Sequence, residues 1–192
     1  MNNKGMVYVF TGDGKGKTSA ALGVAMRTLL IGKKVLWISW YKSNDWDISE
    51  KHLVDKFDNL EMYWAGRGFY IKNAKSAKVN QSLVFDYTTK KSHQTAAKEA
   101  LIFAESILKQ VRDKNRDVDL MVFDEINQTV EDGLLSASSI KKLINNRGEV
   151  NIILTGRKFS KELVECVDLI TDMRKQKHPF DAGMMAVKGL DF

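Results

Sequence analysis

The sequence predicts an α/β protein whose mostly parallel sheet is flanked by helices. Apolar runs alternate with amphipathic stretches over nearly all of the 192 residues, which is the pattern of parallel strands joined by crossover helices. A glycine-rich turn follows the first apolar run directly, as happens where a strand leads into a phosphate-binding loop and a helix. No repeat and no proline-rich linker interrupts the chain. We therefore expect one domain over residues 1–192, long enough to bury a core.

Six apolar runs predict the strands of the sheet. In chain order they are Met6–Phe10, Lys34–Trp40, Leu60–Trp64, Val118–Phe123, Val150–Leu154 and Leu169–Asp172. Each run is short and almost continuously apolar, as strands covered on both faces of a parallel sheet are.

Amphipathic stretches between these runs predict the helices. They are Thr18–Ile31, Ile48–Phe57, Gln94–Arg112, Ser136–Asn146 and Lys161–Val167. The first is the clearest, because Leu22, Ala25 and Leu29 fall on one helical face. The connection over residues 65–93 is long and polar. A loop of that length in a compact domain is usually a lid or a binding element, so we expect one there.

A phosphate-binding loop is predicted between the first strand and the first helix. Residues 11–18 read Thr-Gly-Asp-Gly-Lys-Gly-Lys-Thr. Glycines let several backbone N–H groups converge on phosphate oxygens, and the following helix directs its positive end at them. Lys17 can neutralise phosphate charge, and the Thr18 hydroxyl can hold Mg²⁺. The predicted nucleotide-binding residues of this loop are Gly12, Asp13, Gly14, Lys15, Gly16, Lys17, Thr18 and Ser19.

The loop departs from the usual spacing Gly-x-x-x-x-Gly-Lys-Ser/Thr. Counting back from Gly16 puts Thr11 where the first glycine is due, and a loop that begins at Gly12 is one residue short. The strand before the loop and the helix after it still have the order that a phosphate loop requires. A turn without a ligand is therefore the weaker interpretation, and the expected fold is P-loop NTPase-like, with a RecA-like sheet.

Two carboxylates end the fourth predicted strand. Asp124 and Glu125 follow directly on its apolar run. Ligands of parallel sheets bind at the carboxyl ends of the strands, which puts both acids near the phosphate loop. One of them can hold Mg²⁺, directly or through water. The predicted metal ligands are thus Thr18, Asp124 and Glu125, and the alternative is a pair of solvated acids that open a loop.

Three further side chains could reach the phosphates. Arg157 follows the fifth predicted strand and could bind a phosphate in a forked geometry, or it could cap the next helix. Arg27, in the first predicted helix, could reach back to the phosphate or face solvent. His178 lies in the polar cluster Lys177–Gly183, where it could contact phosphate or be structural. No arrangement of a protein nucleophile and its base is visible, so an enzyme of this kind would bind ATP and present it to another molecule.

Composition narrows the partners and the location. The formal net charge of +6 suits an anionic ligand. Residues 72–98 carry six lysines and one acid, but they have no arginine and few aromatic residues. Nucleic-acid binding is therefore the weaker interpretation of that segment, and a solvated loop is the stronger one. Because the chain has no long apolar run, no signal peptide and only one cysteine, Cys166, we expect no membrane span, no disulfide and a cytoplasmic location.

Taken together, four stretches of the sequence resemble the ATP:corrinoid adenosyltransferases that carry a P-loop, which act on cob(I)alamin or cob(I)yrinic acid a,c-diamide. The stretches are Phe10–Thr18, Leu120–Ile126, Leu154–Arg157 and Lys177–Gly183, and the ending Gly189–Phe192 also looks like that of the family. The resemblance implies that the Co(I) of a reduced corrinoid attacks the 5′ carbon of ATP and that the whole triphosphate leaves. A shortened phosphate loop suits this reaction, because the bond that breaks lies at the ribose end of the triphosphate.

The resemblance also implies roles for individual residues. Lys17, Glu125 and Arg157 would be catalytic, and Arg27 and His178 match family positions near the nucleotide. With Thr18 and Mg²⁺, the catalytic residues would neutralise charge on the departing triphosphate.

On the acceptor side, the resemblance implies that an aromatic segment after the third strand faces the corrin ring. Here that segment is Ala65–Ile71, in which Phe69 matches and Ile71 stands where a tryptophan is common. A flavoprotein-type reductase and a second copy of the chain are the protein partners that the resemblance implies. A P-loop small-molecule kinase or an ATP-dependent ligase is the alternative function, and its mark would be cleavage at the γ-phosphate.

Overall fold

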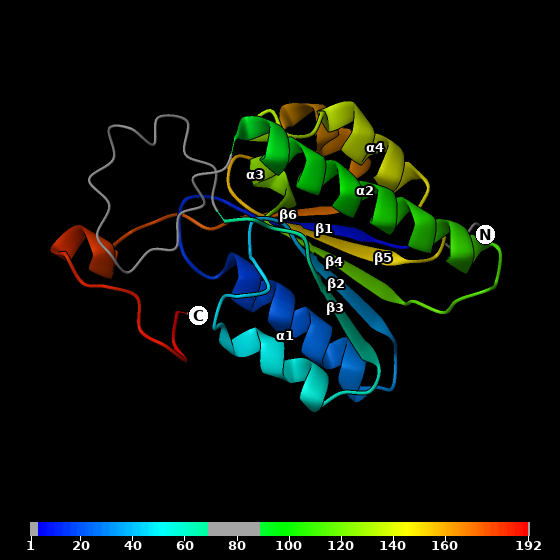
Figure 1. The fold of residues 1–192 in the computed structure, drawn as a ribbon, viewed down its shortest axis with the longest axis horizontal. Coiled ribbons are helices and arrows are strands. Elements are labelled where there is room, and N and C mark those ends of the chain that lie inside the picture. The colour runs from blue at the N-terminus through cyan, green and yellow to red at the C-terminus, as the bar shows by residue number, and fades with distance from the viewer. Residues whose placement is uncertain (1–3, 69–88, 192) are drawn as a thin grey trace.

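A six-stranded sheet forms the centre of the computed structural model, which describes residues 4–68 and 89–191 (Figure 1). Its strands are β1 (Val7–Thr11), β2 (Val35–Ser39), β3 (Leu60–Trp64), β4 (Leu120–Asp124), β5 (Asn151–Thr155) and β6 (Leu169–Asp172). All neighbours pair in parallel, in the order β3-β2-β4-β5-β1-β6. This confirms the predicted α/β class and every predicted strand to within two residues at either end.

Helices cover both faces of this sheet. The α-helices of the described residues are α1 (Lys17–Leu30), α2 (Lys90–Arg112), α3 (Ile126–Glu131) and α4 (Ala137–Asn145), and the 3₁₀ helices are η1 (Ser49–Asp55), η3 (Lys161–Cys166) and η4 (Pro179–Ala182). In Figure 1, α2, α3 and α4 lie over one face and α1 lies over the other. The molecule therefore has three layers, with the sheet in the middle.

Each face of the sheet packs against its own apolar core. One core joins the sheet to α2 and α4 through buried residues such as Ile107 and Ile140. The other joins it to α1 through Ala21 and Leu29. Successive residues of a strand point to opposite faces, so the neighbours Met121 and Val122 of β4 belong to different cores. Burial on both faces explains why the four central strands, β2, β4, β5 and β1, read as continuous apolar runs, whereas the edge strands β3 and β6 are partly or fully exposed.

The helices depart from the predicted ones in several places. The predicted helix Lys161–Val167 is the 3₁₀ helix η3, and η4 was not predicted. The predicted helix Ile48–Phe57 is a shorter 3₁₀ helix, closed by i→i+3 bonds such as that from the Lys56 N–H to the Leu53 carbonyl. Helix α2 begins at Lys90 rather than Gln94, because the Thr89 side chain accepts a hydrogen bond from the Ser92 N–H and caps it. Helix α3 was not predicted at all.

The strand order brings the carboxyl ends of β1, β5 and β4 side by side, since β5 lies between the other two. The chain after β6 runs out beyond this same edge of the sheet, far from the amino end (Figure 1). No helix among the described residues is both long and apolar enough to cross a membrane. The lid or binding element predicted around 65–93 falls mostly on residues 69–88, which lie outside the described residues, as do Phe69 and Ile71.

Candidate functional site

The phosphate loop lies at the carboxyl edge of the sheet, where it joins β1 to α1. Its glycines allow a close approach to the segment that follows β6. At Gly12, φ is +105° and a Cβ atom would lie 2.4 Å from the Met173 carbonyl oxygen. At Gly14 the backbone N–H donates to that same oxygen over 2.7 Å. The loop is therefore held in shape from outside, by backbone that belongs to the end of the chain.

Lys17 begins α1 and is turned back into the loop. Its side chain is buried, and its Nζ donates to the Gly14 carbonyl over 2.6 Å. Burial lowers the pKa of Lys17, and the nearby carboxylate of Glu125 opposes this effect. The first turn of α1 contains no acidic residue. Lys17 and the positive end of the helix thus face the same concave backbone, as phosphate binding requires.

Asp124, the last residue of β4, is completely buried and joins the loop to the sheet. One carboxylate oxygen, Oδ1, accepts hydrogen bonds from the Thr18 hydroxyl at 3.0 Å and from the Thr155 hydroxyl at 2.7 Å. The sequence placed Asp124 and Thr18 together, and the structure brings them into direct contact. Thr155 ends β5 and was not among the predicted site residues.

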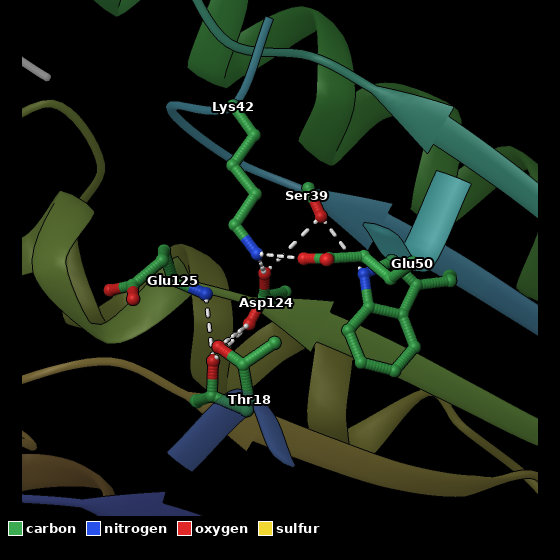
Figure 2. Close-up of polar contacts among 8 residues, drawn as sticks. Thr18, Ser39, Lys42, Glu50, Asp124 and Glu125 are labelled. Atoms are coloured by element: carbon green, nitrogen blue, oxygen red, sulfur yellow. Dashed lines mark hydrogen bonds and ion pairs between the residues drawn. The ribbon is translucent and has the colours of Figure 1, made fainter. Parts of the chain in front are cut away.

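Lys42, Ser39 and Glu50 also surround Asp124 and were not predicted. The Lys42 Nζ lies 2.8 Å from Oδ2 of Asp124 and 2.7 Å from Oε1 of Glu50 (Figure 2). Burial lowers the pKa of Lys42, but its attraction to both carboxylates outweighs burial and raises it. The Ser39 hydroxyl donates to Oδ2 over 3.3 Å. In the sequence, these partners were indicated only by the position of Ser39 and Lys42 at the end of an apolar strand or just after it, in the same way that Asp124 ends β4.

Glu125 adjoins Asp124 but lies in a different environment. Its backbone has a left-handed conformation with φ of 63°, and its N–H donates to the Thr155 hydroxyl over 2.9 Å. The side chain is turned away from Asp124 (Figure 2). Burial first, and then the charge of Asp124, raise the pKa of Glu125 to about 7, while Lys42, Lys17 and Arg157 lower it. Asp124 and Glu125, the two predicted carboxylates, can therefore play different roles in the site.

The three predicted cations lie at different distances from the loop. Arg157, after β5, is exposed, and its charge contributes to lowering the pKa of both Lys17 and Asp13, so it lies near the loop. Arg27 is exposed in the last turn of α1, about 15 Å along the helix from Lys17 at ~1.5 Å per residue. His178 is half-buried in the segment after β6, where its carbonyl accepts from the Asp181 N–H over 3.0 Å. The structure groups only Arg157 with Lys17.

The exposed loop residues contact the end of the chain. The Asp13 carboxylate accepts a hydrogen bond of 3.1 Å from the Lys175 N–H, which lowers the pKa of Asp13. The Lys15 ammonium forms an ion pair with Asp191. Ser19 is exposed on α1 directly after Thr18. The segment over residues 173–191 is thus a further wall of the site that motif spacing alone did not indicate.

A small cavity lies beside the Lys42 turn and under the residues that follow β3. It has room for about one water molecule. Its lining includes Trp40, Tyr41, Ala65, Gly66, Arg67 and His93. The Tyr41 hydroxyl donates to Asp132 over 2.8 Å. Burial, followed by the contact with Asp132, raises the pKa of Tyr41, and Glu125 contributes to the same effect. The cavity therefore adjoins the carboxylates of the phosphate site.

The chain is similar to known proteins over almost its whole length. Residues 3–192 match the model of the family ATP:corrinoid adenosyltransferase BtuR/CobO/CobP. A corrinoid adenosyltransferase of Escherichia coli is 29% identical over 192 residues, which cover 100% of this chain and 87% of that protein. The corrinoid adenosyltransferase CobA of Salmonella typhimurium is 29% identical over 196 residues, covering 98% and 86%. A solved KaiC-like protein of Pyrococcus horikoshii aligns with 90% of this chain and 74% of its own, at 15% identity and a TM-score of 0.47.

Proposed function

The chain belongs to the ATP:corrinoid adenosyltransferase family BtuR/CobO/CobP, and from this membership we propose how its residues share the work of the reaction. The enzyme transfers the 5′-deoxyadenosyl group of ATP to the Co(I) of a reduced corrinoid and releases triphosphate. Cobalt supplies the electron pair of the new Co–C bond, and the pair of the broken C5′–O5′ bond stays on the triphosphate. The protein must therefore hold ATP, exclude water and stabilise a highly charged leaving group.

We assign the triphosphate to the loop of residues 12–18. Its backbone N–H groups, the positive end of α1 and Lys17 supply donors on one side, and Arg157 supplies a second cation near Lys17. The Lys17 ammonium now donates to the Gly14 carbonyl, so we expect it to exchange that contact for a phosphate oxygen. Charge that develops on the leaving oxygen would then meet cations that are already in place, which is how such donors lower a barrier.

Mg²⁺ fits the donors at this loop. In P-loop sites it needs only one or two protein oxygens, because the phosphates and water supply the rest. Thr18 donates its hydrogen to Asp124 and so keeps its oxygen lone pairs for a cation. Asp124 would contact the ion through Thr18 or through water, and Glu125 would be the second acidic residue beside it. The ion would offset the negative charge of the triphosphate.

We place the corrinoid beside the cavity lined by Trp40, Tyr41 and His93. The loop over residues 65–93, with Phe69, would cover the acceptor, as the family resemblance implies. The cavity adjoins Glu125, which supports a role for that residue between the ATP side and the acceptor side.

The clustering of Lys17, Thr18, Asp124 and Arg157 beside an aromatic cavity carries this proposal, and product analysis tests it. The purified protein is mixed anaerobically with ATP, Mg²⁺ and chemically reduced cob(I)alamin, and the loss of the Co(I) spectrum is followed. We expect inorganic triphosphate in a 1:1 ratio with the alkylated corrinoid. ADP that forms regardless of the corrinoid would refute the reaction.

The K17A variant tests the phosphate clamp in the same assay. We expect kcat/KM for ATP to fall about 100- to 1000-fold, as it does when a single donor to a developing oxyanion is removed. Lys161, exposed at the start of η3, provides the matched control, and K161A should keep wild-type kinetics. Equal activity of K17A and K161A would contradict the assignment.

Protein partners and location follow from the family resemblance and the substrates alone. We propose a flavoprotein-type reductase as the source of the electron for Co(I), and a homodimer as the working form. The supply of ATP supports a cytoplasmic location.

A further inference from the structure

We propose that Lys42 is a positioning residue of the nucleotide site: clamped between Glu50 and Asp124, it fixes the Asp124 carboxylate and, through it, the Thr18 hydroxyl toward the metal-bound phosphates. The inference rests on the proposed function for the identity of the ligand. Its argument comes from three features of the described residues, namely the ion pairs of Lys42, the polar chain on the far side of Asp124, and the backbone turn that carries Lys42.

The ion pairs of Lys42 are buried and short. Its Nζ lies 2.8 Å from Asp124 and 2.7 Å from Glu50, and the three side chains are 12%, 0% and 8% exposed. A surface ion pair contributes little, but a buried charge that loses its partner is costly. The charges of Lys42 and Glu50 nearly cancel, so the pair can orient Asp124 while leaving it an anionic acceptor.

The remaining partners of Asp124 give each of its oxygens a fixed donor. The Trp37 indole N–H donates to the Ser39 hydroxyl over 2.9 Å, which directs the hydrogen of Ser39 toward Asp124. Lys42 and Ser39 hold Oδ2, and Thr18 and Thr155 hold Oδ1. Because Thr18 must donate to this carboxylate, its lone pairs face the loop. Without Lys42, the carboxylate would lose its strongest partner and its orientation.

The backbone that carries Lys42 is built for one geometry. Tyr41, just before it, has a left-handed conformation with φ of 68°, which is unusual for a bulky residue. The carbonyls of Tyr41 and Lys42 accept from the N–H groups of Gly68 and Gly66, at 2.8 and 3.0 Å. This turn, strained at Tyr41 and held by two hydrogen bonds, fixes the direction in which the Lys42 side chain leaves the backbone toward Asp124 and Glu50.

Calorimetry and kinetics on four variants test the proposal. K42M removes the charge, K42R keeps it, E50Q weakens the clamp without changing its shape, and K34M is the control. Lys34 precedes β2 at the opposite end of that strand and pairs with Asp117 on the surface at 3.4 Å. The readouts are the Kd of ATP with Mg²⁺, measured without corrinoid, and the KM values of ATP and of reduced cobalamin.

We expect K42M to weaken ATP binding and raise the KM for ATP about 10- to 100-fold, the range for one charge-assisted contact. The KM for the corrinoid should change much less. E50Q should weaken ATP binding in the same direction to a smaller extent, and K42R should recover part of the loss. K34M should match wild type. An unchanged Kd for ATP in K42M, or equal changes in both KM values, overturns the proposal.

Two further outcomes are also decisive. If K42M does not fold, E50Q decides, because wild-type ATP binding in that variant overturns the inference. If wild-type protein binds ATP but transfers no adenosyl group, the proposed function fails, while weakened ATP binding in K42M still supports the role of Lys42.

Discussion

Two adjacent acids at the end of β4 show how a one-residue step changes chemistry. Asp124 points into the sheet, where four donors hold its oxygens. Glu125 turns through a left-handed conformation to the other side, where burial dominates its titration. Asp124 is therefore held in one orientation, whereas Glu125, with a pKa of about 7, can gain or lose a proton near neutral pH.

The raised pKa of Glu125 predicts that the free energy of unfolding of the ligand-free protein decreases as pH rises. The folded state holds a proton on Glu125 up to about pH 7, whereas an unperturbed glutamate releases it near pH 4.5. Between these values the unfolded state binds fewer protons, so the free energy of unfolding decreases as pH rises, by about 3 kcal/mol at the most.

E125Q should remove that part of the dependence. Urea unfolding of wild type and E125Q at pH 5 and pH 8, without nucleotide, checks it. We expect the variant to gain on wild type at pH 8 and to differ little at pH 5. A parallel pH dependence of the two proteins would contradict the raised pKa.

Among the elements, the strands and the phosphate loop could be predicted, and the turn that carries Lys42 could not. Strands that are buried on both faces appear in the sequence as local apolar runs. The partners of Lys42, in contrast, depend on β2 lying next to β4, which no local run indicates. Helix α3 escaped prediction because only six residues form it, and it begins after the left-handed Glu125 rather than at a side-chain cap. The long helix α2 was predicted except for its first four residues, before Gln94.

Gly66 and Gly23 differ in the space around them, so we expect alanine to have opposite effects on stability at the two positions. A Cβ atom on Gly66 would lie 1.9 Å from the Tyr41 carbonyl carbon, and backbone cannot give way as a flexible side chain does. A Cβ on Gly23, in α1, would meet nothing within 4 Å.

We therefore expect G66A to lower the free energy of unfolding by more than about 2 kcal/mol, and G23A to raise it by about 0.5–1 kcal/mol. Thermal and urea unfolding of both variants measure this. A neutral G66A would mean that the turn adapts, and the rigid geometry inferred around Lys42 would fail with it.

On the scale of the whole molecule, the site exists because of strand order. The phosphate loop follows β1, Asp124 ends β4, and Thr155 ends β5, and these strands are neighbours in the sheet. The general rule that parallel sheets bind ligands at their carboxyl edge was enough to predict that Lys17, Thr18 and Asp124 meet. It could not indicate the wall formed by residues 173–191, because the contacts of that segment depend on where β6 lies in the sheet.

A loop that grips phosphates should be stabilised by phosphates alone. A ligand at 100 times its Kd adds about 2.7 kcal/mol to the folded state, which for a protein of this size raises Tm by about 2–4 °C per kcal/mol. We expect inorganic triphosphate with Mg²⁺ to raise Tm measurably in wild type and K161A but not in K17A. Stabilisation by adenosine without stabilisation by triphosphate would point to a base-binding site instead.

The contacts between the phosphate loop and the end of the chain bear on how this protein is best handled. Asp191 pairs with Lys15, and Lys175 binds Asp13 through its backbone. The amino end lies at the opposite side of the sheet (Figure 1). An affinity tag, a fluorophore or a surface linker attached after the last residue would sit beside the bound ATP, whereas the same group at the amino end would leave the site clear. Fusions for assay and immobilisation are therefore best placed at the amino end.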